Sequence, residues 1–179
     1  LIRTRITQLK RELEEVRQHR ELHREGRTRS NIPVAALVGY TSAGKSSLLN
    51  ALTGSEILAD AMLFSTLDTT TRSLPLPDGQ EILLTDTVGF INKLPHRLID
   101  AFRSTLEEAR YAGYILHVVD TSNPQMELQM QVVYDTLWDL KVEDKKIVTL
   151  LNKQDKLLAP MVVKDFRADA SLAGSAKSG

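Results

Sequence analysis

The chain has 179 residues, of which 42% are hydrophobic, so it is long enough for one domain with a real core and a short appendage. Basic and acidic residues balance at 23 each, so net charge gives no support for nucleic-acid binding, and the lack of cysteine excludes disulfides and thiolate metal sites. No apolar run is long enough to cross a bilayer and no signal peptide is recognisable, so we expect a cytoplasmic protein.

An apolar stripe runs through the first part of the chain, with side chains four and three residues apart at Ile2, Ile6, Leu9, Leu13 and Val16. This spacing predicts a helix that ends near Gly26 and is followed by a linker. The stripe is too short for a stable coiled coil alone, so it requires a partner, either an upstream helix or a second copy of the chain. The basic residues of this segment could bind a polyanion or could form an ordinary solvated helix face. We therefore expect a helical arm and linker at 1–30 and a main domain at 31–179.

A phosphate-loop pattern, G-x-x-x-x-G-K-[ST], is matched at every fixed position by Gly39-Tyr40-Thr41-Ser42-Ala43-Gly44-Lys45-Ser46. The apolar run before it predicts a strand at 34–39, and residues 45–53 predict a helix that stops at Gly54. Together they form a cradle of backbone N–H groups for di- and triphosphates, with Ser47 at its end. In this cradle Lys45 would reach the β- and γ-phosphate oxygens, and the Ser46 hydroxyl would bind Mg²⁺.

A threonine-rich loop follows at residues 64–72. Such a loop suits a switch whose threonine hydroxyl completes the Mg²⁺ shell when a triphosphate is bound. We favour Thr71 over Thr70 for this role because Thr71 directly precedes a basic residue. A plain surface loop is the alternative.

The next motif is Asp86-Thr87-Val88-Gly89, at the end of a hairpin with strands at 71–77 and 81–86 and a turn at Asp78-Gly79. A carboxylate at a strand end opposite the phosphate loop is where a Mg²⁺-holding Asp86 is expected. The Gly89 N–H is a natural donor to a γ-phosphate. Many phosphate-loop hydrolases have a water-positioning Gln at the next position. Here that residue is Phe90, whose side chain cannot hydrogen-bond to water.

Alternating helices and strands continue at 96–112, 114–120, 125–140 and 146–151. We expect Leu137, Trp138 and Leu140 to form the core face of their helix, and His117 to be a buried strand residue. Strands separated by helices should be parallel. The predicted fold class is therefore α/β, a Ras-like phosphate-loop domain whose mostly parallel sheet has one antiparallel strand and flanking helices, preceded by the N-terminal helix.

The last strand ends in Asn152-Lys153-Gln154-Asp155, which identifies the base. The Asp155 carboxylate can accept from both N1–H and the 2-amino group of guanine, whereas adenine has neither donor. Asn152 would contact the acceptor edge of the base, and the Lys153 stem would lie along the ring. Ser175-Ala176-Lys177 would complete the pocket with a backbone N–H toward guanine O6. The sequence therefore predicts binding of GTP and GDP.

These motifs resemble the HflX family of ribosome-associated GTPases, and the resemblance covers nearly the whole chain. The stretches that carry it are 39–54, 64–68, 70–72, 86–91, 94–96, 101–108, His117-Val118-Val119-Asp120 and Asn123-Pro124. It implies binding to the large ribosomal subunit and splitting of ribosomes under stress, with residues 1–26 as the second arm of a helical hairpin. Two departures are Thr69, where the family usually has Pro, and a stop at Gly179 before the usual last helix, from which we expect a truncated fragment.

Hydrolysis is expected to occur by in-line attack of water on the γ-phosphate, with Lys45, Thr71 and Gly89 at the reacting group. Because Phe90 supplies no water contact, we expect a slow intrinsic rate and acceleration by a partner. Two other functions remain open: a metabolic kinase, which would leave residues 152–155 unexplained, and a GTP-dependent assembly or tethering module with incidental hydrolysis.

Overall fold

A computed structural model describes residues 32–54, 70–90, 108–142, 144–159, 161 and 163–178, together with Thr7, Arg11, Glu15 and Gln18. The chain divides into two compact units, Leu1–Ile32 and Pro33–Gly179. In the first unit the four described residues are helical and exposed, and Arg11 pairs with Glu15 one turn later at 3.5 Å. The apolar stripe of this arm, and any self-association through it, lies outside the described residues.

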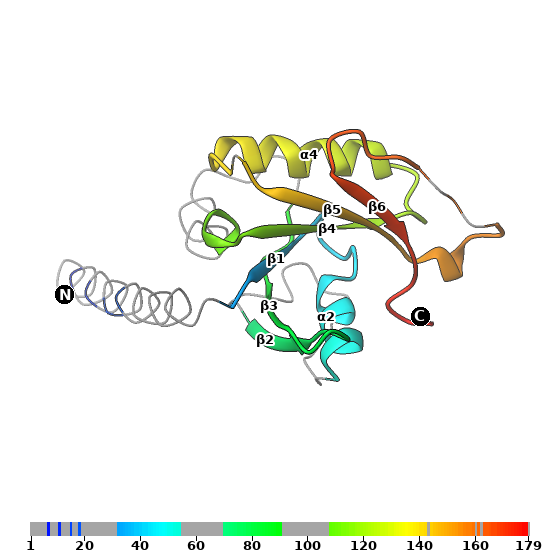
Figure 1. Cartoon of the computed structure of the whole chain (residues 1–179). Coiled ribbons are helices and arrows are strands. Elements are labelled where there is room, and N and C mark those ends of the chain that lie inside the picture. Colours follow the sequence, from blue (N-terminus) through cyan, green and yellow to red (C-terminus); the bar gives the residue numbers. More distant parts are fainter. Residues whose placement is uncertain are drawn as a thin grey trace. The chain divides into compact units, whose positions relative to one another are not determined.

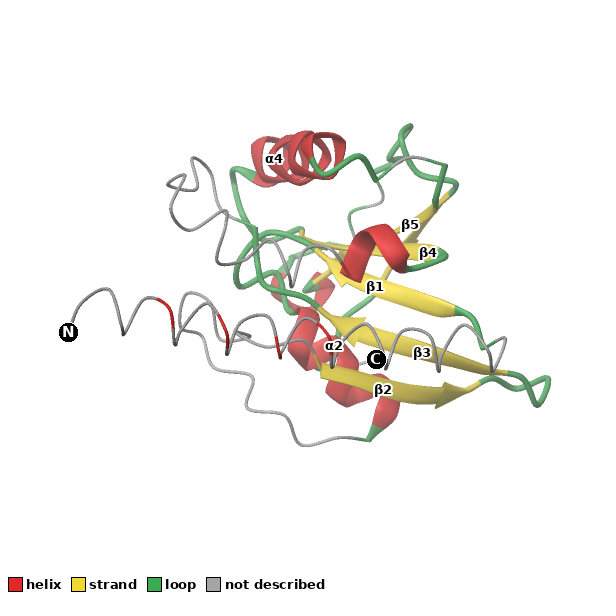
Figure 2. Cartoon of the chain, turned by 90° about the vertical axis from the view of Figure 1, so that its left-hand side faces the viewer, coloured by secondary structure: helices red, strands yellow, loops and turns green. Residues whose placement is uncertain are grey.

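The second unit is built on a six-stranded sheet with the order β2-β3-β1-β4-β5-β6 (Figure 1). Only β2 and β3 run antiparallel, and the other neighbours are parallel. The strands are β1 (Val34–Val38), β2 (Thr70–Pro75), β3 (Glu81–Asp86), β4 (Tyr114–Asp120), β5 (Lys146–Asn152) and β6 (Ala170–Ala173). Helices α2 (Lys45–Thr53) and α4 (Met126–Asp139) lie on opposite faces of the sheet (Figure 2), and a short 3-10 helix, η1, spans Gln154–Lys156. The predicted fold class is confirmed.

Most expected elements are found within two residues of their predicted bounds, and α2 matches exactly. In the expected hairpin, Gly79 has φ +82° and the Asp78 carboxylate accepts from the Gln80 N–H at 3.1 Å, which closes the turn between β2 and β3. The expected helix at 96–112 is described only from residue 108, where it is helical to 111. Strand β6 was not predicted, because three of its four residues are small and it lies at the sheet edge, where it pairs with β5.

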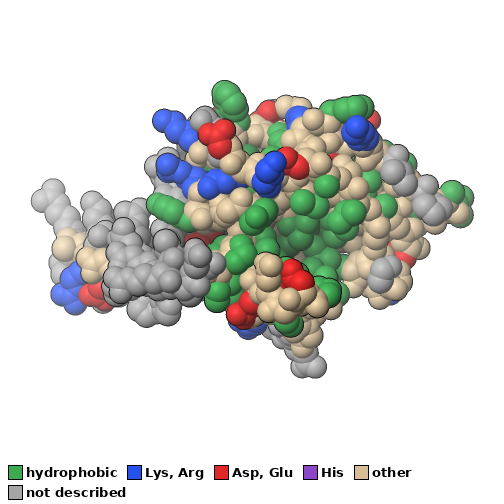
Figure 3. Space-filling view, in the orientation of Figure 1, with side chains coloured by type: hydrophobic (Ala, Val, Ile, Leu, Met, Phe, Trp, Pro, Cys, Tyr) green, Lys and Arg blue, Asp and Glu red, His purple; other side chains and the backbone are tan. Residues whose placement is uncertain are grey.

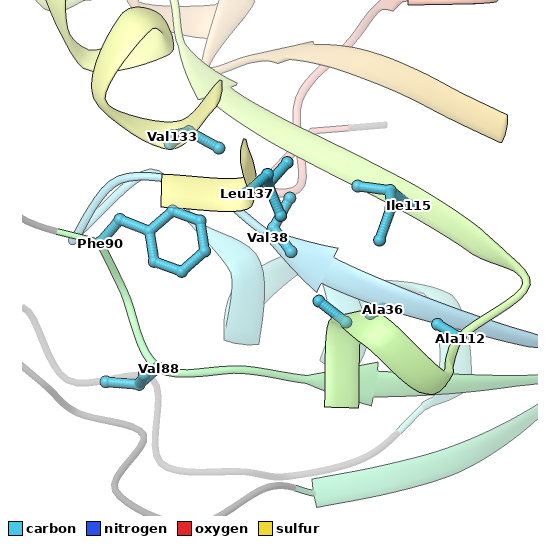
Figure 4. Close-up of a cluster of buried hydrophobic side chains, with 9 residues drawn as sticks. Ala36, Val38, Val88, Phe90, Ala112, Ile115, Val133 and Leu137 are labelled. Atoms are coloured by element: carbon cyan, nitrogen blue, oxygen red, sulfur yellow. The ribbon is translucent and has the colours of Figure 1, made fainter. Parts of the chain in front are cut away.

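Side chains from the central strands alternate between the two faces and form two cores. Toward α4, Val38, Ile115 and Phe90 pack with the helix residues Val133 and Leu137 (Figure 4). Toward α2, the core is made by the neighbouring strand residues and the helix, with buried Ala35, Leu37, Leu48, Leu49, Leu84 and Val118. Figure 3 shows hydrophobic side chains exposed between β6 and α2. Leu172 of β6 is 58% exposed.

The expectation that Trp138 faces the core is wrong, because its side chain is 73% exposed. The buried stripe of α4 is Met126, Met130, Val133 and Leu137, with spacings of four, three and four. Trp138 follows Leu137 and is therefore turned about 100° around the helix axis. Leu140 does pack against the core.

A buried polar cluster lies on the α4 face of the sheet. The Asp165 carboxylate accepts from the Tyr134 hydroxyl at 2.5 Å and the Thr149 hydroxyl at 2.8 Å, and Nδ1 of buried His117 lies 4.0 Å from the same oxygen. Burial raises the pKa of Asp165, but the bonds from Tyr134, Thr149 and the Arg167 N–H outweigh it and lower the pKa. The cluster thus anchors the segment that leads into β6.

We predict that His117 makes the protein sensitive to mild acid. Burial lowers its pKa from 6.5 to about 4, so between these values the unfolded chain binds a proton that the native state does not. The loss of stability that His117 causes should be absent above about pH 6.5 and reach about 3 kcal/mol as the pH falls to 4. Urea unfolding at several pH values should show this slope in the natural chain and a flatter one in His117→Gln. The carboxylates Asp120 and Asp165, whose pKa values are lowered, would act only below about pH 4. Equal slopes in both proteins would contradict the assignment.

Candidate functional site

The phosphate loop connects the end of β1 to the start of α2 in a conformation that requires its glycines. A Cβ on Gly39 would lie 2.3 Å from the Val118 carbonyl oxygen, and one on Gly44 would lie 2.4 Å from Asn152 Nδ2. Gly44 also has φ +99°, in the left-handed region, and it is the N-cap of α2 without a side-chain hydrogen bond. Glycine offers no side chain to cap the first turn of α2, and a helix N-terminus that follows such a loop is a typical anion site.

Lys45 lies at the base of this loop with only 6% of its surface exposed. Its Nζ donates to the carbonyl oxygens of Gly39 at 3.3 Å and Tyr40 at 3.2 Å. Burial lowers the pKa of Lys45 to about 8, an effect that the charge of Asp86 partly offsets. The ammonium thus sits where phosphate oxygens would replace the weak carbonyl contacts and would compensate the cost of burial.

The expected metal ligands Ser46 and Asp86 are brought together from forty positions apart, and the Ser46 hydroxyl donates to Asp86 Oδ2 at 2.7 Å. Asp86 ends β3 beside Leu37 of β1 and is fully buried. A hydroxyl and a carboxylate are hard oxygen donors, so this pair fits Mg²⁺. Among the described residues no group of three or more His, Cys, Asp and Glu is arranged to hold a metal.

Thr71, the third expected metal ligand, lies inside β2 opposite Thr85, and their hydroxyls are 3.0 Å apart. Thr70, the alternative, pairs with Asp86 itself at the strand end. The rest of the threonine-rich loop, residues 64–69, lies outside the described residues. Metal binding by Thr71 stays a prediction, and it would require the Thr71 hydroxyl to leave Thr85.

Gly89 and Phe90 dock against the phosphate loop through the backbone. The Phe90 N–H donates to Gly39 at 3.0 Å, and the Thr41 N–H donates to Phe90 at 2.8 Å. A Cβ on Gly89 would lie 2.7 Å from Thr41 Cα and 3.1 Å from Lys45 Nζ, so the Gly89 backbone lies close to the ammonium group. The Phe90 ring is fully buried in the α4-side core (Figure 4) and points away from this loop.

The base motif lines a pocket of about 590 Å³ beside α2. It brings together Gly44, Ser47, Asn50, Ala51, Asn152, Lys153, Asp155, Lys156, Ser175, Ala176 and Lys177. The Ser175 hydroxyl donates to Asp155 Oδ1 at 2.6 Å, and this bond lowers the pKa of Asp155, so the exposed carboxylate is charged at neutral pH. The same Ser175 oxygen accepts from the Lys177 N–H, which shapes the last loop.

Asn152 has a structural task that its sequence motif does not reveal. Its Nδ2 donates to the Ala43 carbonyl oxygen at 2.9 Å, and its Oδ1 accepts from the Ala176 N–H at 2.9 Å. Asn152 is buried and joins the phosphate loop to the last loop. A contact between Asn152 and the base stays a prediction.

Asp120 was not singled out from the sequence as a site residue. It ends β4 beside Asn152 at the end of β5, and its Oδ2 accepts from Lys153 Nζ at 2.7 Å. The signal that could have found it is a polar residue at the carboxyl end of a buried parallel strand, where sites of open α/β sheets are built. Asn50, Ala51 and Lys156 of the pocket were not predicted as site residues, because they lie outside the phosphate-loop and base motifs themselves.

A family model described as "50S ribosome-binding GTPase" matches residues 34–153. The chain is 58% identical over 179 residues to "GTPase HflX" of Lacrimispora saccharolytica, covering all of this chain and 42% of that protein. It is 40% identical over 157 residues to "GTPase HflX" of Escherichia coli, covering 88% of this chain and 37% of that protein. The chain thus spans less than half the length of these curated relatives.

Solved structures of GTP-binding proteins are also similar to this chain. A crystal structure of SsGBP with GDP superposes with a TM-score of 0.69 at 30% identity, covering 97% of this chain and 53% of that one. A GTP-binding protein from Sulfolobus solfataricus, also in complex with GDP, gives 0.65 at 28% identity, with 90% and 52% covered. Within the described part of the chain, no helix is long and apolar enough to cross a membrane.

Proposed function

Because this chain belongs to the family of 50S ribosome-binding GTPases and represents a region of the HflX proteins, we propose that it binds GTP and GDP and hydrolyses GTP as a switch on the large ribosomal subunit. The observation that carries the proposal is the placement of two sets of groups around α2. Lys45, Ser46 and Asp86 gather at its N-terminus, and the Asp155–Ser175 pocket lies beside its first turns.

Guanine is the base that this pocket suits. The Asp155 carboxylate is fixed through one oxygen by Ser175, and its ionised form accepts from the N1–H and 2-amino donors of guanine. Adenine would offer Asp155 no donor, so a site built on these bonds rejects it. The aliphatic stem of Lys153, which lines the pocket, supplies an apolar surface for the flat ring.

The phosphates would lie over the phosphate loop, where the α2 N-terminus and Lys45 neutralise their charge. Ser46 and Asp86, with Thr71 as the expected third ligand, would hold Mg²⁺, which supplies positive charge to the β- and γ-phosphate oxygens. The Gly89 N–H would donate to the γ-phosphate. Loss of the γ-phosphate on hydrolysis would then release the loop that follows Asp86. This coupling of loop position to the γ-phosphate is the basis of a switch.

Slow intrinsic hydrolysis follows from Phe90. The residue at this position contributes its side chain to the core and not to the attacking water. A partner must therefore order the water or supply a charged group, and the family description supports the ribosome in that role. Such a partner would place the protein in the cytoplasm.

The test is single-turnover hydrolysis of γ-labelled GTP by the 179-residue chain, with and without purified 50S subunits. We expect slow phosphate release, faster release with subunits, and none above background in Lys45→Ala. Release that is unchanged in Lys45→Ala would contradict a GTPase site. A rate that subunits leave unaffected would contradict the ribosome-activated switch and favour a GTP-dependent assembly module.

A further inference from the structure

The Lys153 side chain bridges two loops that meet at the candidate site. Its Nζ donates to the Ser42 carbonyl oxygen of the phosphate loop at 2.7 Å and to Asp120 Oδ2 at the end of β4, also at 2.7 Å. Both residues of the ion pair are largely buried, since the Lys153 side chain is 21% exposed and the Asp120 side chain 13%. Lys153 therefore lies between the loop that cradles phosphates and the strand end beside the base motif.

Ser42 and Lys153, which this hydrogen bond joins, both have unusual backbone conformations. Ser42 has φ +59° and Lys153 has φ +64°, in the left-handed region that residues with a side chain rarely adopt. Such conformations persist where surrounding contacts hold them in place. Next to this bridge, the Asn152 amide donates to the Ala43 carbonyl oxygen. Adjacent side chains 152 and 153 thus tie the base motif to adjacent carbonyls 43 and 42.

The two oxygens of Asp120 do different things. Oδ2 accepts from Lys153, whereas Oδ1 accepts from the Ser122 N–H at 3.0 Å and the Ser122 hydroxyl at 2.6 Å, which fixes the turn after β4. Burial raises the pKa of Asp120, but the bonds from Lys153 and Ser122 outweigh it and lower the pKa, so the carboxylate is charged at neutral pH. One residue thus anchors a turn and holds the lysine.

We propose that Asp120 is a positioning residue that holds Lys153 against the Ser42 carbonyl and thereby slows the release of a bound guanine nucleotide. The inference rests on the proposed function, because it concerns the same pocket. A bound nucleotide would contact both the base motif and the phosphate loop, and this bridge holds the two in the position that allows both contacts. Without Asp120, one neutral carbonyl remains to hold the ammonium, and the lysine stem would sample other rotamers.

Asp120→Asn separates the two tasks of Asp120. The asparagine oxygen can keep both Ser122 bonds, while its amide places N–H groups against the Lys153 ammonium, where no hydrogen bond forms. We expect release of fluorescently labelled GDP, measured by stopped flow, to become about tenfold faster, with little change in the melting temperature. In a Lys153→Ala background the same substitution should add less than about twofold, since its partner is absent.

A second lysine–aspartate pair at the other end of β5 supplies the matched control. Asp169 accepts from Lys146 Nζ at 3.1 Å and, through its other oxygen, from the Ile147 N–H at 2.8 Å. Asp169→Asn should leave GDP release unchanged. Release that stays at the natural rate in Asp120→Asn, or that accelerates equally in the Lys153→Ala background, would overturn the positioning role alone. A natural chain that binds GDP no better than ADP would overturn both the inference and the proposed function.

Discussion

Replacing Asp155 by asparagine is expected to abolish the preference for guanine, with a loss of GDP affinity of about a hundredfold or more. The carboxylate can accept from both the N1–H and the 2-amino group of guanine. An asparagine amide would place its NH₂ group against at least one of these donors, where no hydrogen bond can form. The same amide can donate to the 2-oxo group of xanthine, so affinity for xanthosine diphosphate should rise. Competition titrations with both diphosphates measure the exchange.

The local structure should survive this substitution, because the asparagine oxygen can still accept from the Ser175 hydroxyl that now bonds to Asp155. Asp135→Asn, an exposed change on α4, is the control and should alter neither affinity. If Asp155→Asn lost GDP without any gain for the xanthine nucleotide, Asp155 would act on pocket shape and not on base recognition.

The second large effect is expected for Phe90→Gln. Although glutamine is the water-positioning residue of many related hydrolases, the side chain at this position is fully buried among Val38, Ile115 and Val133 (Figure 4). A buried amide there would lose apolar contacts and hydrogen bonds to water, which we expect to cost about 3 kcal/mol of stability. GTP hydrolysis should not become faster. Urea unfolding and single-turnover hydrolysis measure the two effects.

Phe90→Leu is the matched change, since it keeps the site apolar and should cost about 1 kcal/mol. The prediction is wrong if Phe90→Gln folds as stably as Phe90→Leu and hydrolyses GTP faster than the natural chain. That result would mean that this side chain can leave the core and reach the attacking water.

Local patterns were sufficient to predict much of the fold. Helix α2 and the hairpin around Gly79 are both encoded within short stretches of sequence. The helix could be predicted from apolar residues that recur on one face, and the turn from a glycine that can adopt positive φ. Trp138 shows the limit of this reasoning, since an error of one position changes the predicted face of a helix residue from exposed to buried.

Contacts between distant residues could not be predicted in the same way. Strand β6 is held by pairing with β5, and Asp165 becomes buried only when its segment meets Tyr134 and Thr149. In the site, the motifs named Lys153 and Asn152 as base residues. The sheet register places Asp120 beside Asn152, and side-chain hydrogen bonds join Asn152 and Lys153 to carbonyl oxygens of the phosphate loop.

The most direct test of the account is an equilibrium titration of the 179-residue chain with GDP, GTP, ADP and ATP in the presence of Mg²⁺. We predict that both guanine nucleotides bind at least about a hundredfold more tightly than their adenine counterparts, because the Asp155 carboxylate, which Ser175 holds by donating to it, can accept from the N1–H and 2-amino groups that adenine lacks. Equal affinity for GDP and ADP would contradict the central claim that this pocket selects guanine.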